Sequence, residues 1–452
     1  MAQDNVSDLL DKSAATYAAV AHEIWELAEV GYQEHRSAAK LQALLANAGF
    51  QIKAGVAAIP TAFVASYGEG EPVIGIMGEY DALPGISQAA QPDRAIIEGQ
   101  GAGHACGHHL FGTGSAAAAI AVKHWLDEGH TGTIRFYGTP AEEGGAGKVY
   151  MVREGLFDDV DVMLHWHPGD TNDASPYTTL ANRSAKFRFH GKSAHAAAAP
   201  ERGRSALDGV EAMNYMVNLL REHVPQEARI HYVITQGGHA PNVIPDFAEV
   251  YYYVRHPNAT ILEGIWSRVV AAAEGAAMGT GTQMAHEVIH GIHSVLPNHT
   301  LANVMHAQLK KVGGVEYSEE ERTFAASLQQ SFDAPPALAQ ARAIQPVVLQ
   351  ATSGSTDVGD VSWVVPTAGL DAATWVPGTA AHSWQAIAAG GMSIGHKGMM
   401  VAAKTMALTA ITLMKDPATV AAAKAEFEQL RGDDFVYKPL LGDRDPPLDY
   451  RN

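Results

Sequence analysis

Hydrophobic positions in the first 182 residues follow helical and strand-like patterns in turn. Apolar residues recur at helical spacing over 21–47 with a break near Gly31, and 114–128 and 147–154 also predict helices. Four short apolar runs predict strands: 62–67, 73–77, 133–138 and 160–164. The first two are joined by a tight turn at 68–70. Strands that alternate with helices predict an α/β domain with a largely parallel sheet.

The pattern changes in the middle of the chain. It predicts, in order, a strand, a helix, two strands, a helix and a strand: 185–189, 207–220, 229–235, 247–255, 261–278 and 283–290. This β-α-β-β-α-β order is that of a ferredoxin-like sandwich. We therefore expect an inserted α+β domain at 183–293 within a discontinuous α/β domain formed by 1–182 and 294–452.

The remaining segments return to the first pattern. Helical or strand-like runs recur at 301–312, 347–349 and 391–414, and the tail after Gly432 is predicted to be a surface arm. The chain has 452 residues, which is too long for one ordinary core. Two domains are therefore expected.

Charge and cysteine content limit the classes of partner and compartment. The net charge of −18 argues against nucleic-acid binding, which needs clustered Lys and Arg. The polar stretch 1–11 lacks the apolar core of a signal peptide, and Cys106 is the single cysteine. The most apolar helical stretch, 398–414, is short and is interrupted by Lys404. We expect a cytoplasmic protein with no membrane span and no disulfide.

The segment 99–115 is the most informative for chemistry. It places Cys106 and His108 two residues apart in a glycine-rich loop before a helix, with His104 and His109 beside them. An extended backbone points side chains at such spacing the same way. Thiolate and imidazole are good ligands for Zn²⁺ and similar metals, whereas short Cys/His runs also occur without metal.

Two further motifs follow predicted strands directly. Glu142 and Glu143 come after the strand at 133–138, where α/β proteins place their sites. Adjacent side chains point in different directions, so one carboxylate could bind metal while the other handles a proton. His165 and His167 follow the strand at 160–164, and spacing alone does not choose between them. The loops with His195 and His382 each carry a single histidine, which is usually structural.

Other catalytic frameworks fit poorly. Residues 112–117 match a permissive dinucleotide fingerprint, but they follow a histidine-rich loop and not a clean strand. Residues 391–395 match the letters G-x-S-x-G, but they open the run at 391–414 and do not follow a predicted strand, as a nucleophile elbow must. The sequence contains no G-x-x-x-x-G-K-[ST] phosphate loop. A dehydrogenase and an α/β-hydrolase are therefore disfavoured.

Taken in order, the motifs resemble those of the metal-dependent amidohydrolases that include aminoacylases, hippurate hydrolases and auxin-conjugate hydrolases. The resemblance covers most of the chain and rests on these segments: 24–29, 31–34, 78–84, 140–143, 191–195, 241–245 and the His382 loop. Where the family usually has Asp after its Cys-Gly-His motif, this chain has His109. Residues 110–115, 166–168 and 355–360 resemble the aminobenzoyl-glutamate hydrolase branch.

The resemblance implies a di-metal aminopeptidase-like catalytic domain whose insert serves as lid and dimerisation domain. It implies five metal ligands: Cys106, His108, Glu143, His167 and His382. His167 is selected over His165 because the family's ligand lies six positions after the strand residue corresponding to Asp161. It also implies Glu142 as general base and His195 as a catalytic residue that holds the substrate or its oxyanion across a dimer interface. Asn242 and Arg255 are implied substrate-binding residues, and Asp81 is implied to orient a histidine ligand.

These roles predict a hydrolase that cleaves the amide bond of a small N-acyl amino acid, such as an aminobenzoyl-glutamate conjugate. Two divalent metal ions per subunit are expected, Zn²⁺ or Mn²⁺ first and Co²⁺ or Ni²⁺ as alternatives. A homodimer through the insert is expected, with a hetero-oligomer as the alternative. Two other functions stay open: a dipeptidase or aromatic amide hydrolase, and a non-catalytic subunit of a hetero-oligomeric hydrolase.

Overall fold

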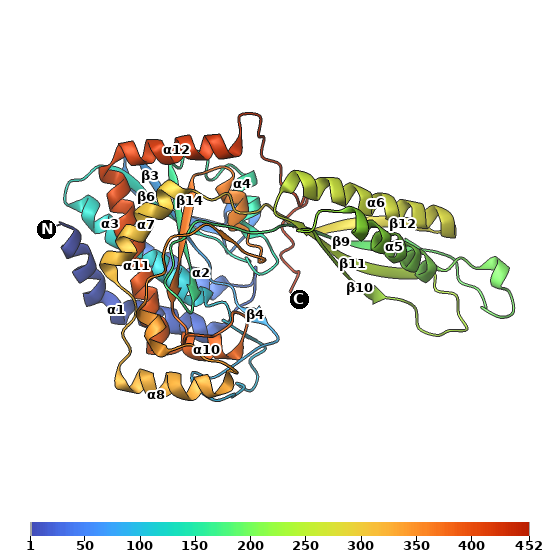
Figure 1. The fold of residues 1–452 in the computed structure, drawn as a ribbon, viewed down its shortest axis with the longest axis horizontal. Helices are drawn as coiled ribbons and strands as arrows, with labels where there is room; N and C mark the ends of the chain where they lie inside the picture. The colour runs from blue at the N-terminus through green and yellow to red at the C-terminus, as the bar shows by residue number, and fades with distance from the viewer. Residues whose placement is uncertain (1, 452) are drawn as a thin grey trace.

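The computed structural model describes residues 2–451, and it consists of a broad α/β body with a long narrow lobe projecting from it (Figure 1). Met1, part of the polar N-terminal stretch, and Asn452 lie outside the described residues. The two parts have separate sheets and separate hydrophobic cores. The predicted α/β class with an inserted α+β unit is confirmed.

The body is built on a six-stranded sheet in the order β1-β2-β6-β3-β7-β14. Its strands are β1 (Gln51–Ala54), β2 (Phe63–Glu69), β3 (Val73–Gly78), β6 (Gly132–Gly138), β7 (Val162–Gly169) and β14 (Thr367–Ala373). The pairs β6/β3, β3/β7 and β7/β14 are parallel, and the pairs β1/β2 and β2/β6 are antiparallel. The carboxyl ends of β6, β3, β7 and β14 therefore meet at one edge of the sheet.

The turn predicted to join the strands at 62–67 and 73–77 does not form a hairpin. β6 lies between β2 and β3 and pairs with both, antiparallel to β2 and parallel to β3. The hydrophobic residues of β3 are thereby placed in the buried middle of the sheet, with Ile74 and Ile76 fully buried. Because β6 pairs with β2 on one side and with β3 on the other, the two strands that are adjacent in sequence, β2 and β3, do not pair with each other.

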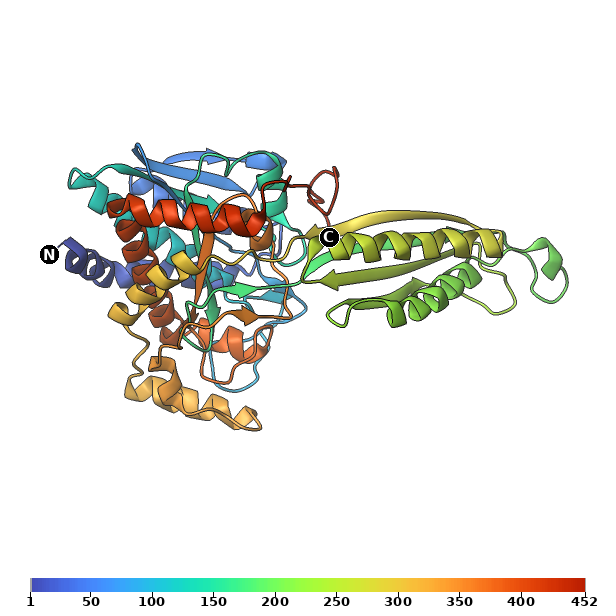
Figure 2. The same cartoon turned by 45° about the horizontal axis from the view of Figure 1, so that its top comes forward.

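Helices cover both faces of this sheet (Figures 1 and 2). They are α1 (Ala2–Leu27), α2 (His35–Asn47), α3 (His108–Asp127), α4 (Gly147–Arg153), α7 (His299–Val312), α8 (Glu319–Leu328), α9 (Val358–Ser362), α10 (Trp384–Gly390), α11 (Ser393–Lys415) and α12 (Pro417–Arg431). α3 is buried along nearly all its length because small residues run from Gly112 to Ala119, which lets α1 and α11 pack closely on it. Two short strand pairs complete the body: β4 (Leu83–Pro84) with β5 (Ala102–Gly103), and β8 (Tyr177–Thr178) with β13 (Gln350–Ala351).

The lobe is a four-stranded antiparallel sheet with two helices on one face. Its elements are β9 (Ala181–His190), α5 (Ala206–Leu220), β10 (Arg229–Gln236), β11 (Phe247–His256), α6 (Ala259–Thr280) and β12 (Gln283–Ile292). The strand order β10-β11-β9-β12 is that of a ferredoxin-like sandwich, as the element order predicted. The segment that contains the 3₁₀ turn at 200–202 lies at the end of the lobe farthest from the body (Figure 1).

The segment after Gly432 is not the surface arm that its composition predicted. Leu440 and Leu441 are buried, and Arg444 donates hydrogen bonds to the backbone carbonyls of Val288 and Ile289 on β12. Farther along, the Tyr450 hydroxyl donates to the backbone carbonyl of Glu143. The tail therefore connects the base of the lobe to the loop after β6.

A membrane-spanning helix needs about 20 predominantly apolar residues. Among the described residues, no helix combines enough length with enough apolar character to cross a bilayer. α11, which includes the apolar stretch 398–414, is instead buried in the body core.

Candidate metal centre

The carboxyl ends of four neighbouring strands bring the candidate site together. β3 leads into Glu79 and Asp81, β6 leads into the Glu142–Glu143 loop, and β7 carries His167 near its end. Cys106 and His108 come from the loop before α3 and its first turn, and His382 comes from the loop after β14. The predicted ligands therefore converge from segments up to 276 positions apart, Cys106 to His382.

Asp81 holds two of the predicted ligand segments in place. Its Oδ1 lies 2.9 Å from Nδ1 of His108, and its Oδ2 accepts a hydrogen bond of 2.9 Å from the backbone N–H of Glu143. Asp81 thus occupies one nitrogen of His108 and leaves Nε2 facing the cluster. This contact is the one expected of a residue that orients a histidine ligand from behind.

Gly107 between Cys106 and His108 explains the local sequence. Its φ is +79°, and a Cβ there would lie 2.7 Å from Cβ of Pro168. Only glycine combines this left-handed conformation with so close an approach. It turns the chain so that Cys106 faces the cavity while His108 begins α3.

Three residues with positive φ that are not glycine flank the cluster: Ala141, Ala146 and His382, with φ of +58°, +58° and +62°. Such conformations cost of order 1–3 kcal/mol each and persist only where the surroundings impose them. The backbone N–H of His382 donates to the Ala105 carbonyl at 2.9 Å, which fixes its loop beside the Cys106 segment. Backbone strain at these three positions therefore accompanies the placement of the site's side chains.

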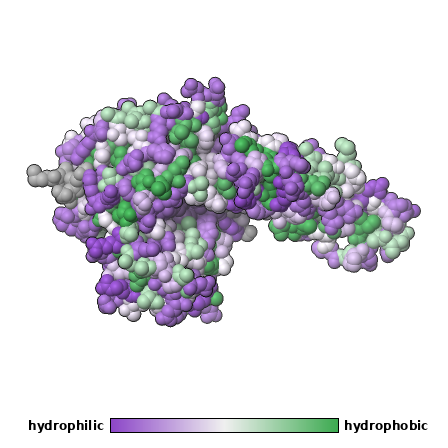
Figure 3. Space-filling view, in the orientation of Figure 1, coloured by the Kyte–Doolittle hydropathy of each residue, from purple (hydrophilic) through white to green (hydrophobic). Residues whose placement is uncertain are grey.

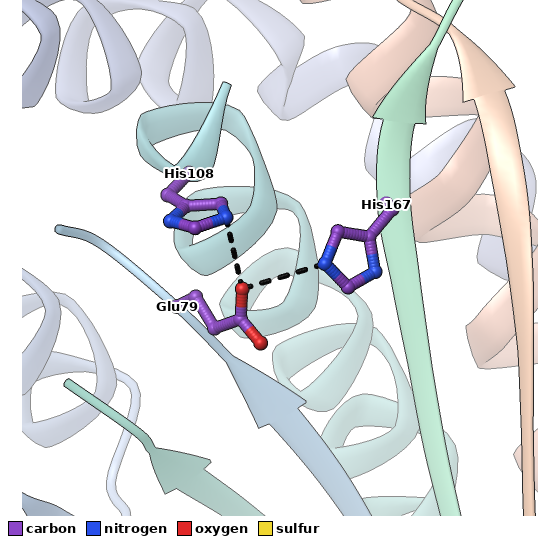
Figure 4. A group of neighbouring side chains, drawn as sticks. All are labelled: Glu79, His108 and His167. Atoms are coloured by element: carbon purple, nitrogen blue, oxygen red, sulfur yellow. Dashed lines mark ion pairs between the residues drawn. The ribbon is translucent and has the colours of Figure 1, made fainter. Parts of the chain in front are cut away.

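Two overlapping groups of potential ligand atoms result. Cys106, His108 and Glu143 form one group, and Glu79, His108 and His167 form the other, with the ligand atoms of each group within 4.8 Å of one another. Figure 4 shows the second group, in which His108 from α3 and His167 from β7 point at the same carboxylate oxygen of Glu79. The distances from Oε2 of Glu79 are 3.0 Å to Nε2 of His108 and 3.5 Å to Nε2 of His167. His382 joins through its Nε2, 3.1 Å from Oε1 of Glu143.

Two buried atoms test whether this cluster suits a metal. Nε2 of His108 and Oε1 of Glu143 have no hydrogen-bond partner among the described residues, although each lies near an oppositely charged group. Buried polar atoms without such partners are uncommon in proteins and call for an explanation. Soft thiolate, imidazole and carboxylate donors together suit a borderline transition metal. The residues therefore fit divalent metal ions.

The protonation properties of the cluster reflect closely packed charges. Burial would raise the pKa of Cys106, but His108 lowers it below its ordinary value. The Cys106 thiolate and the Glu143 carboxylate beside it raise the pKa of His382 to about 10. Burial, with Glu79 and Glu143 close by, holds the pKa of Glu142 well above its usual range. The site thus favours the thiolate of Cys106 and makes the Glu142 carboxylate a stronger base than an ordinary glutamate.

A buried ion-pair network supports the cluster from behind. Nζ of Lys148 lies 2.6 Å from Oε1 of Glu79 and 2.7 Å from Oδ1 of Asp357, and all three side chains are fully buried. Glu79, Lys148 and Asp357 were not expected as site residues. Glu79 and Asp357 stand in motifs that resemble the family, 78–84 and 355–360, and each follows or precedes a regular element, which is the signal that could have identified them.

A cavity of about 280 Å³ opens beside the cluster. Cys106, Glu142, Glu143, His167 and His382 line one end of it. The other residues that line it lie on β7, β8, β13, β14 and the loops beside them: His165, Asp173, Ser175, Tyr177, Thr179, Gln350, Thr352, Gly354, Ser355, Thr356, Gly369, Leu370 and Asp371. Glu142 therefore faces both the ligand cluster and a space of substrate size.

Three predicted residues lie on the lobe and not at the cavity. His195 is exposed in the segment at the far end of the lobe, where its Nδ1 accepts backbone N–H groups of Ala197 and Ala198. Asn242 is exposed and Arg255 lies on β11, and neither lines the cavity. Within the described residues of one chain, the structure does not bring these three to the cluster.

His109, the position at which the chain departs from the family pattern, points away from the cluster. It is fully buried, and its Nε2 lies 3.0 Å from the Gly390 carbonyl on α10. Its imidazole therefore contributes to packing between α3 and α10.

Comparison with known proteins gives a consistent result. The model of peptidase family M20/M25/M40 matches residues 75–437. The chain is 42% identical to one subunit of the p-aminobenzoyl-glutamate hydrolase of Escherichia coli (strain K12), covering 96% of each chain. It is 30% identical to Xaa-Arg dipeptidase of Mus musculus, covering 93% of this chain and 91% of that one. Among solved structures, a dinuclear metal-binding peptidase from Bacillus subtilis has a TM-score of 0.62 at 19% identity, covering 90% of this chain and 99% of that one.

Proposed function

This chain belongs to peptidase family M20/M25/M40, and from that premise we propose that it is a metal-dependent hydrolase of N-acyl amino acids of the aminobenzoyl-glutamate type. Metal-dependent amide hydrolysis is the activity of its relatives. The observation that carries the proposal is the convergence of Cys106, His108, Glu143, His167 and His382 beside a cavity that Glu142 also lines.

The residues of the proposed site have three roles: metal ligands, a general base and an aspartate that orients a ligand. Two divalent ions held by the five ligands would supply a water of lowered pKa and polarise the scissile carbonyl. Zn²⁺ or Mn²⁺ is proposed, with Co²⁺ or Ni²⁺ as alternatives, because the mixed donor set accepts several borderline metals. Glu142 takes a proton from the attacking water and passes it to the leaving amine, which an amide needs because its leaving group is poor. Asp81 fixes the orientation of His108 and of the Glu143 backbone.

The lobe is proposed to act as lid and dimerisation domain, spanning 183–293 between the catalytic segments 1–182 and 294–452. Exposed apolar side chains gather on α5 and the edge strand β10: Tyr215, Met216, Leu219, Tyr232, Val233 and Ile234. Figure 3 shows hydrophobic side chains along the lower edge of the lobe, where Figure 1 places β10 and α5. An edge strand with apolar residues is a template for pairing, so a second copy of the chain is the proposed occupant.

Dimerisation would explain the position of His195. Within one chain His195 lies at the far end of the lobe, so we propose that it reaches the cavity of a second copy of the chain and stabilises the oxyanion there. Asn242 lies on the same lobe segment, where its carbonyl accepts the N–H of Ala196, and it is proposed to contact substrate together with Arg255. A cysteine ligand suits a reducing compartment, so the cytoplasm is the proposed location.

Chelation is expected to abolish hydrolysis reversibly. Protein treated with a chelator should release no amine from aminobenzoyl-glutamate, hippurate, N-acetyl amino acids or dipeptides, and Mn²⁺ or Zn²⁺ should restore release. The assay measures free amine, with metal content measured in parallel. Turnover that persists after both metals are removed would contradict the proposal, and the preferred substrate would separate the N-acyl amino acid function from that of a dipeptidase.

Mixing two inactive variants is expected to restore activity. Homodimers of Glu142→Gln and of His195→Ala should both be impaired, but a mixed dimer contains one site with Glu142 from one protomer and His195 from the other. With random exchange, about a quarter of the sites regain both groups, because half the dimers are mixed and each has one intact site. No recovery from protomers shown to exchange would contradict supply of His195 by the partner.

One comparison supports a hetero-oligomer as the alternative to the homodimer. The relative that is 42% identical is named as one of the subunits of its hydrolase, so pairing with a different chain is the alternative to a homodimer. The presence of Glu142 and of all five proposed ligands argues against a non-catalytic role in such an assembly. Sedimentation of the purified chain alone, followed by the hydrolysis assay, separates these assemblies.

A further inference from the structure

The wall of the cavity opposite the metal ligands has an unusual polarity. Among the described residues that line the cavity, four are acidic (Glu142, Glu143, Asp173 and Asp371), and none is Lys or Arg. Glu142 and Glu143 belong to the proposed catalytic centre. Asp173 and Asp371 remain on the wall, and the register neighbour of Asp371 is His167, a proposed metal ligand.

Asp371 is placed to contact a substrate. It lies on β14 directly beside His167 of β7 in the parallel register, so its side chain is on the same face of the sheet as a proposed ligand. The side chain is exposed to the cavity, and no described residue forms a hydrogen bond or an ion pair with it. Its carboxylate is therefore free to accept hydrogen bonds from a ligand.

The side-chain amide of Gln350 offers a further hydrogen-bond acceptor near Asp371. Asp173 is occupied, because its Oδ1 accepts the N–H of Ser175 and its Oδ2 accepts the side-chain amide of Gln350, both at 2.7 Å. The bond to Asp173 turns the amide nitrogen of Gln350 away and leaves its Oε1 without a described partner. Asp173 thus positions Gln350 as a second acceptor on the wall.

An independent observation on the same wall also points to a ligand. His165 lines the cavity and is 2% exposed, and its Nδ1 has no hydrogen-bond partner among the described residues. A buried polar atom left unpaired costs about 1–3 kcal/mol. A ligand that fills the cavity and carries polar hydrogens would satisfy the acceptors of this wall.

The charge of the wall determines which part of the substrate it takes. A substrate of the proposed class has a carboxylate on its amino-acid part, and the carboxylates of Asp371 and Asp173 would repel it from this wall. The acyl part must then enter the cavity and displace water from Asp371. A desolvated carboxylate without a donor is strongly unfavourable, so the acyl group needs an N–H donor at this point.

We propose that Asp371, with Gln350 beside it, recognises an amino group on the acyl part of the substrate and so determines specificity. The proposal rests on the proposed function and deepens it by naming the residues that select the acyl group, through an arylamine or an ammonium group at its far end. Both the arylamine and the ammonium group supply an N–H donor, and the experiment distinguishes between them.

The test compares acyl-glutamates that differ only at the para position of a benzoyl ring. The amino, aminomethyl, nitro and unsubstituted compounds carry an arylamine, an ammonium, a group of similar size without a donor, and no group. For the metal-loaded protein we expect kcat/KM at least ~10-fold higher for the preferred amino compound than for the nitro and unsubstituted ones, since a hydrogen bond to a charged group contributes about 1.5–3 kcal/mol. Preference for the amino or for the aminomethyl compound shows whether the site takes an arylamine or an ammonium group.

Asp371→Asn is expected to remove most of this preference, by lowering kcat/KM for the preferred amino compound toward the value for the unsubstituted one, because a neutral amide forms a weaker hydrogen bond with the amino group than a carboxylate does. Asp159→Asn, at an exposed carboxylate paired with Arg135, is the matched control and should retain the preference. Equal hydrolysis of all four compounds, or an equal loss for all of them in Asp371→Asn, would overturn the inference and leave the proposed function intact.

Binding separates failure of the inference from failure of the proposed function. Absence of hydrolysis for every compound would contradict the proposed function. Calorimetric binding of 4-aminobenzoate against benzoate to the metal-loaded protein then measures the same contact without turnover. Tighter binding of 4-aminobenzoate that is lost in Asp371→Asn would support the inference, and equal binding would overturn it.

Discussion

Glu142→Gln is expected to lower kcat at least ~100-fold while the protein keeps its metal ions, since a positioned base contributes 10²–10⁴-fold. Glutamine has nearly the same size and keeps the contact surface toward the cavity, but it cannot accept the proton of the attacking water. The five proposed ligands are unchanged. Steady-state kinetics, with metal content measured on the same preparation, provide the comparison.

Glu154→Gln is the matched control for this substitution, because Glu154 is an exposed carboxylate just after α4 on the same loop-helix unit. It should leave kcat unchanged. A Glu142→Gln protein with normal turnover would remove Glu142 from the role of base, and one that loses its metals would show that the carboxylate is needed for binding them.

Lys148→Met is expected to destabilise the protein by about 3–5 kcal/mol in the free energy of unfolding, because it leaves two fully buried carboxylates without their cation. Lys148 contacts both Glu79 and Asp357, and none of the three is exposed. Denaturant unfolding of the metal-free protein measures the change. Lys40→Met, which removes the exposed pair with Glu23, is the control and should cost at most about 1 kcal/mol.

The loss in free energy of unfolding caused by Lys148→Met should also depend on pH. Burial already raises the pKa of Asp357 to about 6 with Lys148 present, and loss of Lys148 removes an interaction that lowers it. The folded variant then holds protons that the unfolded chain has released, so its stability falls as pH rises from about 4 through the folded pKa. A smaller deficit at pH 5 than at pH 8 is expected, and addition of Asp357→Asn should recover part of the loss at pH 8. A deficit that does not change with pH would indicate packing and not charge as its origin.

The element pattern was predictable, whereas the strand partners were not. Alternation of apolar runs with helical periodicity depends on nearby residues, and it located β3, β6 and the elements of the lobe. The insertion of β6 between β2 and β3 depends on contacts made about 60 residues later in the chain. Nothing in residues 62–77 encodes that partner, so the local pattern favours the hairpin.

The same distinction applies to the site. The motifs at Cys106–His108, Glu142–Glu143 and His165–His167 could be located because they stand at strand ends or in a glycine-rich loop, where side chains of parallel sheets converge. The choice of His167 over His165, and of His382, rested on the resemblance to the family. Lys148 could not be selected, since lysine on a short helix is usually exposed and its burial depends on Glu79 and Asp357 from distant segments. The tail after Gly432 is polar in sequence, and its ordered path depends on acceptors on β12 and at Glu143.

The separation of the lobe from the body has a consequence for biosynthesis. Every strand and helix of the lobe lies within 181–292, so this unit can acquire its core while the ribosome is still translating the rest. The body cannot do so, because β14 at 367–373 completes its sheet and α11 covers α3. During synthesis the first 180 residues therefore leave the apolar edge of β7 and the alanine surface of α3 uncovered for nearly 200 further codons. Chaperones that bind nascent chains are expected to engage this protein at the N-terminal body segment and not at the lobe.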